Sequence, residues 1–150
     1  EEQRLIMWER REAAAEISLL KKPLINNDIA VPLEKISEFL TIMENKLPEL
    51  DPEADVLIVS HLGDGNVHYT VWPSLDDEKH KDKIMEAIEN VVLFLGGSFS
   101  AEHGIGISKL SSMERRKDSV ALKVMRQIKD AIDPKGIMNP GKVLPREYDS

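Results

Sequence analysis

The stretch that decides the fold is Asp55-Val-Leu-Ile-Val-Ser-His-Leu-Gly-Asp-Gly-Asn-Val-His-Tyr-Thr-Val-Trp72. Residues 55–60 are apolar and β-branched and residues 67–72 alternate in polarity, so both runs predict strands. Between them, Asp64-Gly65 is typical of a two-residue hairpin turn, because both central positions of that turn have positive φ. The stretch therefore predicts an antiparallel hairpin.

The predicted hairpin brings two histidines together. With residues 64–65 as the turn, Leu62 lies opposite Val67 and His61 lies opposite His68. Directly opposed residues share one face of the sheet, with Cβ atoms roughly 4.5–5.5 Å apart. Two imidazoles at that separation can hold one divalent metal ion. The alternative is that the pair is ordinary polar surface on a solvated sheet face.

A second run, Ser98-Phe-Ser-Ala-Glu-His-Gly-Ile-Gly106, supplies a third histidine beside a carboxylate. Two histidines and a glutamate are a usual ligand set for zinc or a similar ion with an open coordination position. On a continuing strand Glu102 and His103 would point to opposite faces. Both can serve one site only if the chain bends there, and Gly104 makes such a bend easy.

Three blocks of sequence, in this order, resemble the C-terminal domain of FAD-linked oxidases. They are residues 61–68, Ser100-Ala-Glu-His-Gly-Ile-Gly106 and Asp133-Pro-Lys-Gly-Ile-Met-Asn-Pro-Gly-Lys-Val-Leu-Pro145. The family includes D-lactate dehydrogenases, the glycolate oxidase flavin subunit and D-2-hydroxyglutarate dehydrogenase. The resemblance implies oxidation of a D-2-hydroxy acid to the 2-oxo acid, with hydride transfer to FAD.

The resemblance also implies roles for individual residues of the site. His61, His68 and Glu102 match the ligands of a divalent metal, zinc or similar, and His103 matches the base that takes the proton of the substrate hydroxyl. The chemistry is consistent, because an imidazole with an unperturbed pKa of about 6.5 can accept a proton at pH 7. If His103 is instead a fourth ligand, the base is missing.

Two further candidates, Arg11 and Asn139, come from the same resemblance, and a third, Asn66, comes from its place in the hairpin. Arg11, in Trp8-Glu-Arg-Arg-Glu12, matches an arginine that contacts the substrate carboxylate, and the alternative is a solvated charge on a helix. Asn66 is a candidate substrate contact, with a role in the turn as the alternative. Asn139 is a candidate cofactor contact, because the resemblance places the C-terminal block against the flavin.

The chain departs from the hydroxyglutarate-type members at two positions. Ala15 stands where those members carry a threonine, and Asn26 stands where they carry a lysine. The chain therefore lacks two polar contacts for a second substrate carboxylate.

The remaining pattern predicts an α+β fold, an antiparallel sheet with helices packed on one face (a ferredoxin-like cap domain) plus C-terminal helices. His80 falls in a charged run of one helix and is interpreted as a solvated side chain. The expected helices cover residues 1–22, 32–48, 75–94, 107–116 and 118–132, and the expected strands cover residues 24–31, 55–60, 67–72 and 98–102.

Composition narrows the class of protein. The 150 residues carry a formal net charge of −7 and few aromatics, which speaks against nucleic-acid binding. Cysteine is absent, so no disulfide or thiolate chemistry is expected. No signal peptide or transmembrane run is visible, and a cytoplasmic or mitochondrial-matrix location is expected. We expect residues 1–150 to be one substrate-binding domain, truncated at its N-terminus, of an enzyme whose FAD-binding domain lies elsewhere.

Several alternatives stay open at this point. A non-redox metal-dependent hydrolase could use the same two histidines and glutamate, and a binding module could keep the fold without the chemistry. The expected partner is a small 2-hydroxy acid, with a quinone, a cytochrome or an electron-transfer flavoprotein as electron acceptor. A homodimer is one alternative for the oligomeric state.

Overall fold

The computed structural model of the chain describes residues 1–18, 21–61 and 63–145. Contacts within the chain group into two compact units, residues 1–101 and residues 102–150. None of the helices among the described residues is long and apolar enough to cross a membrane. In chain order the elements are α1 (Glu2–Ser18), β1 (Ile25–Ala30), the 3₁₀ helix η1 (Leu33–Lys35), α2 (Ile36–Leu50), β2 (Asp55–His61), β3 (Asn66–Trp72), α3 (Glu78–Phe94), α4 (Leu110–Arg116) and α5 (Ser119–Ile132).

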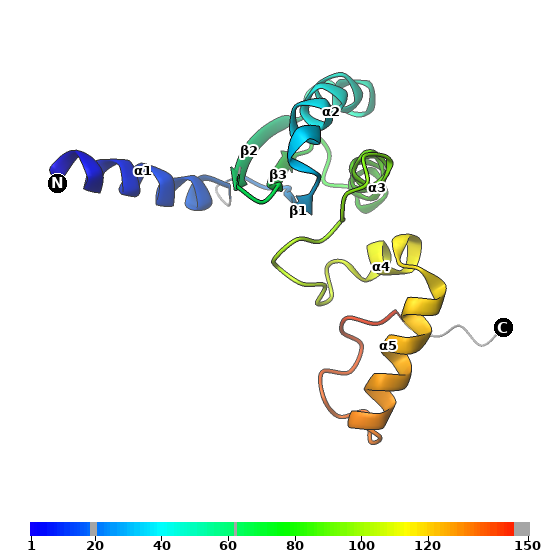
Figure 1. The fold of residues 1–150 in the computed structure, drawn as a ribbon. Coiled ribbons are helices and arrows are strands. Elements are labelled where there is room, and N and C mark those ends of the chain that lie inside the picture. The colour runs from blue at the N-terminus through cyan, green and yellow to red at the C-terminus, as the bar shows by residue number, and fades with distance from the viewer. Residues whose placement is uncertain (19–20, 62, 146–150) are drawn as a thin grey trace. The chain divides into compact units, whose positions relative to one another are not determined.

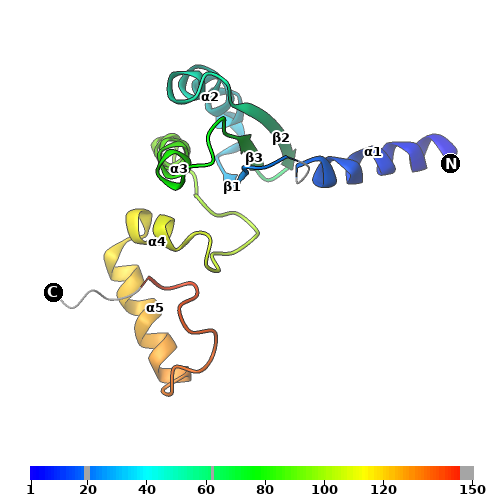
Figure 2. The same cartoon turned by 180° about the vertical axis from the view of Figure 1, so that it is seen from behind.

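The first unit is built on a three-stranded antiparallel sheet with the strand order β1-β3-β2. Helices α2 and α3 lie beside this sheet (Figure 1 and Figure 2). Side chains alternate between the two faces of a strand, and one face supplies the apolar core. That core also takes in the buried side chains of both helices, and its largest fully buried members are Ile29, Phe39, Met43, Val67, Val71, Ile84, Ile88 and Val92.

The opposite face of the sheet carries a group of polar residues among apolar ones such as Leu57 and Val59, and we call it the polar face. Counting by alternation from the strand register, it carries Asp28 of β1, Asn66 and His68 of β3, and His61 of β2. Apolar side chains therefore hold the sheet to its helices, while the other face presents groups that can bind ligands.

The hairpin forms as predicted, but its register differs by two residues. His61 pairs with Asn66, and His68 pairs with Val59. The amide of Asp64 donates to the carbonyl of His61 (3.2 Å), and the amide of Asn66 donates to the Asp64 carboxylate (3.1 Å). The strands therefore end at His61 and begin again at Asn66, so the connection is longer than the expected two-residue turn. The predicted place of Leu62 lies outside the described residues.

Contacts with β1 explain the longer loop. The amide of Val31 donates to the carbonyl of Gly65 (3.1 Å), so the loop is fixed to the end of β1. Gly65 has a φ of 78°, and a Cβ at this position would collide with the carbonyl oxygen of Val31. This close approach requires glycine. The register of the hairpin is therefore set by pairing with β1 and not by the preference for a two-residue turn.

The expected fourth strand at 98–102 is reduced to one bridge. Ser98 pairs antiparallel with Ala30 through two backbone hydrogen bonds of 2.8 and 2.9 Å. The Ser98 hydroxyl then donates to the carbonyl of Ser100, which turns the chain away from the ladder. The bridge lies beside β1, so the four pairing segments still follow the ferredoxin-like arrangement that the sequence predicts.

The second unit consists of α4, α5 and the segment that follows them. Asp118 caps α5, because its carboxylate accepts from the amide of Ala121 (2.9 Å). The expected apolar stripe of α5 is largely exposed, from 46% at Val124 to 69% at Ile132. The helix therefore buries little of its apolar surface against the described residues.

Candidate functional site

The two histidines of the hairpin meet on the polar face of the sheet. Their ring centroids lie 5.2 Å apart, and the ring planes cross at 83°. His61 and His68 are diagonal neighbours rather than opposed residues, because the register is displaced by two. A shift of two positions keeps a side chain on the same face, so the predicted juxtaposition is confirmed although the predicted register is wrong.

A buried aspartate lies beside this pair. Asp28 is directly opposite His68 in the register of β1 and β3, and it is 1% exposed. One carboxylate oxygen, Oδ1, lies 3.8 Å from Nδ1 of His68. The other oxygen accepts from the amide of Ala101 (3.3 Å), which also donates to the Asp28 carbonyl (3.1 Å). The aspartate therefore connects the histidine strand with the chain just before Glu102.

Sequence reasoning did not assign a role to Asp28. A signal was present, because an aspartate stands in a run whose neighbours Ile25, Ile29 and Val31 are core residues. Charged residues are seldom fully buried without partners. A carboxylate between core residues of a short strand was therefore a signal for a site.

Asn66 is placed by the same buried carboxylate. Its side-chain nitrogen donates to Oδ1 of Asp28 (2.9 Å) and to the carbonyl of Ile29 (3.0 Å). Asn66 is 4% exposed, and among the described residues its Oδ1 is buried without a hydrogen-bond partner. Asn66 thus supports Asp28, and its contact with a substrate stays a prediction.

Glu102 and His103 follow Ala101 at a bend. The chain at 101–103 is not a strand, and Gly104 has a φ of 71°, so the bend that the sequence required is present. An oxygen of the Glu102 carboxylate lies 3.7 Å from Nε2 of His103, so the two side chains lie near each other. Glu102 directly follows Ala101, whose amide donates a hydrogen bond to the Asp28 carboxylate.

Arg11 lies on α1, and the ring of Trp8 on the same helix lies against it. The guanidinium carbon is 5.4 Å from the ring centroid, a cation–π distance. Arg11 is exposed and lies outside the sheet that carries the histidines. The sequence-based link between this arginine and the substrate stays a prediction.

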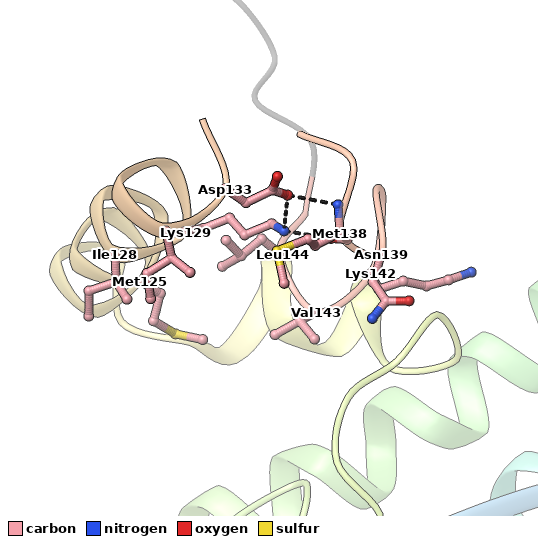
Figure 3. A pocket seen from close by; sticks show the side chains of 10 residues that line it. Met125, Ile128, Lys129, Asp133, Met138, Asn139, Lys142, Val143 and Leu144 are labelled. Carbon is pink, nitrogen blue, oxygen red and sulfur yellow. Dashed lines mark hydrogen bonds and ion pairs between the residues drawn. The ribbon is translucent and has the colours of Figure 1, made fainter. Parts of the chain in front are cut away.

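Asn139 lies on the wall of a cavity of about 410 Å³ between α5 and the C-terminal segment (Figure 3). The segment is held by Asp133, whose carboxylate accepts from Lys129 (2.6 Å) and from the amide of Met138 (2.9 Å). The hydrogen bond from Lys129, followed by the backbone donors, lowers the pKa of Asp133. Asn139 itself has a φ of 47°, which asparagine tolerates better than most residues.

His80 differs from its predicted role as a solvated side chain. Its Nε2 lies 2.9 Å from Oδ2 of Asp51, and its side chain is 18% exposed. The amides of Ser74 (2.8 Å) and Glu53 (3.3 Å) also donate to this carboxylate. Burial alone would raise the pKa of Asp51, but these donors outweigh burial and lower the pKa to about 2. The pair fixes the start of α3 to the loop after α2.

The polar sheet face has donors that fit a borderline divalent ion. Two imidazoles lie in ring contact, and a buried carboxylate lies beside one of them. Imidazole and carboxylate ligands suit zinc and similar ions, and carboxylates commonly orient metal-bound histidines. The donor chemistry therefore agrees with the metal that the sequence predicts.

Comparison with known proteins gives one family. The family model described as "FAD linked oxidases, C-terminal domain" matches residues 1–143. The chain is 34% identical over 143 residues to a probable mitochondrial D-2-hydroxyglutarate dehydrogenase of Oryza sativa subsp. indica, covering 93% of this chain and 24% of the relative. It is 31% identical to a D-2-hydroxyglutarate dehydrogenase of Stutzerimonas stutzeri, covering 96% and 32%.

A third relative differs in the substrate that its name states. The chain is 35% identical over 122 residues to a D-lactate dehydrogenase of Anaerostipes hadrus, covering 77% of this chain and 25% of the relative. The chain thus spans about a quarter to a third of the length of these curated relatives. These matches agree with the flavoenzyme interpretation and not with the metal-dependent hydrolase. The chain belongs to the family of the C-terminal domain of FAD-linked oxidases.

Proposed function

We propose that this chain is the substrate-binding part of an FAD-dependent dehydrogenase that oxidises a D-2-hydroxy acid, of D-lactate or D-2-hydroxyglutarate type, to the 2-oxo acid. The observation that carries the proposal is the contact of His61 and His68 on the polar sheet face, beside buried Asp28. Membership of the FAD-linked oxidase family supports it. A substrate of the glycolate type, which the sequence resemblance also implies, belongs to the same proposal.

His61, His68 and Glu102 are the proposed ligands of a divalent metal, zinc or similar. A bound metal would act as a Lewis acid on the substrate's hydroxyl and carboxylate oxygens and lower the hydroxyl pKa. The two histidines lie on one sheet face in ring contact, which favours a shared ion. Glu102 follows directly on Ala101, whose amide is fixed by Asp28. The two imidazoles extend from the paired strands β2 and β3, and strands position side chains more precisely than loops do.

His103 is the proposed general base. Its imidazole would take the proton of the substrate hydroxyl, whose C–O bond becomes the carbonyl of the 2-oxo acid. FAD, when bound, would supply the acceptor for the hydride that leaves the Cα. The two electrons leave with the hydride and the proton stays on the imidazole, so the step balances. The adjacent Glu102 carboxylate, 3.7 Å from Nε2, would stabilise the imidazolium that forms.

Arg11, Asn66 and Asn139 complete the proposed set. An arginine fork suits a carboxylate, so Arg11 is the proposed partner of the substrate's C1 carboxylate. Asn66 is the proposed second substrate contact, and its buried Oδ1 is an acceptor that a substrate hydroxyl could use. Asn139 is the proposed cofactor contact, at the wall of the cavity beside α5. The proposal includes an electron acceptor that reoxidises the flavin, and a homodimer. Because several relatives are named as mitochondrial, the mitochondrial matrix is one proposed location.

The test is a screen of D-2-hydroxy acids against the natural protein that contains this sequence, followed as anaerobic bleaching of its flavin. Ala15 and Asn26 offer no cation for a second carboxylate. An unpaired distal carboxylate would be desolvated at a cost of a few kcal/mol. We therefore expect kcat/KM for D-lactate to be at least equal to that for D-2-hydroxyglutarate.

The L-enantiomers serve as the matched control, and they should leave the flavin oxidised. A preference for hydroxyglutarate of roughly tenfold or more, which is about 1.4 kcal/mol of transition-state binding, would show that another cation reaches the distal end. Absence of bleaching with every 2-hydroxy acid, in protein that holds FAD and metal, would contradict the proposed activity.

A further inference from the structure

Among the described residues, the Asp28 carboxylate is a buried charged group for which the proposed function gives no role. It is 1% exposed, and it lies on the polar face of the sheet rather than in the apolar core. A buried carboxylate is unfavourable unless its oxygens accept hydrogen bonds or it serves a bound cation. We therefore expect this aspartate to contribute to binding at the histidine pair.

The hydrogen bonds of Asp28 connect two segments of the chain. Oδ1 accepts from the Asn66 side chain on β3 (2.9 Å), and Oδ2 accepts from the amide of Ala101 (3.3 Å). His68 is two residues from Asn66 on β3, and Glu102 is the residue after Ala101. One carboxylate thus fixes the backbone next to two of the proposed metal ligands.

The same carboxylate also faces His68 itself. Oδ1 lies 3.8 Å from Nδ1, the ring nitrogen on that side of the imidazole. In many metal sites a carboxylate accepts from one ring nitrogen of a histidine, which sets the tautomer and directs the other nitrogen to the ion. The distance here needs to shorten by about 1 Å to reach the usual N–H···O range.

We propose that Asp28 is a positioning residue of the metal site: it orients His68 through Nδ1, so that Nε2 is the ligand atom, and it fixes the chain that leads into Glu102. This inference rests on the proposed function, because it requires the metal at His61 and His68. Both carboxylate oxygens already accept hydrogen bonds from the protein. A carboxylate has further lone pairs, and Asp28 also lies in a group of possible metal ligands with His68, Glu102 and His103. We assign Asp28 to the histidine rather than to the ion because its Oδ1 faces Nδ1 of His68.

The test compares two aspartates in the natural protein that contains this sequence. Asp28→Asn removes the charge beside His68, and Asp51→Asn removes the charge of a second buried aspartate that contacts a histidine, His80. Zn²⁺ affinity is measured by competition with a chromophoric chelator, and Co²⁺ substitution reports the coordination geometry by its visible bands.

Asp28→Asn should weaken Zn²⁺ binding roughly 10–100-fold, as is typical for partners of metal-bound histidines, and should keep the Co²⁺ band positions. Asp51→Asn should leave Zn²⁺ affinity within about twofold of wild type, whatever stability it loses. If the Asp28→Asn affinity also stays within twofold, the inference is wrong. If that variant changes the Co²⁺ bands, Asp28 is a ligand and the positioning role is overturned. If the wild type binds neither ion, the proposed metal site fails and the inference fails with it.

Discussion

Two buried aspartates of this chain each lie beside a histidine, and they have different surroundings. Asp51 is 2.9 Å from Nε2 of His80, and backbone amides complete its hydrogen bonds. Asp28 is 3.8 Å from Nδ1 of His68, whose ring is also in contact with the ring of His61. The first pair connects a loop to a helix, and the second lies on the polar face of the sheet.

The difference shows how one pair of residue types can serve two purposes. Where the carboxylate and the imidazole are in hydrogen-bond contact, the pair contributes to folding. Where a carboxylate lies near one imidazole and a second imidazole joins them, the group has the composition of a metal site. Proximity of an aspartate to a histidine is therefore not by itself evidence of catalysis.

The largest expected effect is on the rate of flavin reduction, and it distinguishes the proposed base His103 from His80, which contacts Asp51. In the natural protein, His103→Asn should retain bound metal and lose substrate-driven flavin reduction by about 10²–10⁴-fold, the usual contribution of a positioned base. His80→Asn is the matched control, and its rate of flavin reduction should stay near that of wild type. Anaerobic stopped-flow bleaching alongside metal analysis measures both. A wild-type rate in His103→Asn would show that the assigned base is wrong.

A smaller effect concerns stability and pH. Hydrogen bonds from His80, Ser74 and Glu53 hold the pKa of Asp51 at about 2 although burial opposes this, whereas an unfolded aspartate has a pKa of about 3.9. A lowered folded-state pKa stabilises the fold above the unfolded pKa, and this contribution is lost as pH falls through the folded value. It amounts to about 2 kcal/mol at pH 7.

Urea unfolding of wild type and Asp51→Asn between pH 7 and pH 2 tests this contribution. The difference in unfolding free energy should be constant down to about pH 4 and should shrink between roughly pH 4 and pH 2. A difference that does not change with pH would mean that the Asp51 charge does not stabilise the fold.

The comparison also shows what the sequence could predict at the site. The hairpin and its histidine pair follow from alternation and from the Asp64-Gly65 turn residues. The turn length was wrong, because hydrogen bonds from β1 to the loop, such as Val31 to Gly65, are long-range. The error was an even number of residues, so His61 and His68 still share a face. A register error of one residue would have placed the two histidines on opposite faces of the predicted sheet.

The histidine partner of each buried aspartate could not be assigned from local pattern alone. Asp28 meets His68 only through the pairing of β1 with β3, two strands that α2 and β2 separate in the sequence. Asp51 meets His80 across the whole hairpin, and the charged neighbours of His80 suggested a solvated face. The α+β class, in contrast, follows from periodicities within single elements, and it was predicted correctly.

The central claim is that the histidines of the sheet face hold a metal and that the histidine held by Asp51 does not. The most direct measurement is the metal content of the purified natural protein, determined by inductively coupled plasma mass spectrometry for wild type, His68→Ala and His80→Ala. We predict one divalent ion per chain in wild type and in His80→Ala, and loss of that ion in His68→Ala. Stoichiometric metal in His68→Ala, or its loss in folded His80→Ala alone, would contradict the claim.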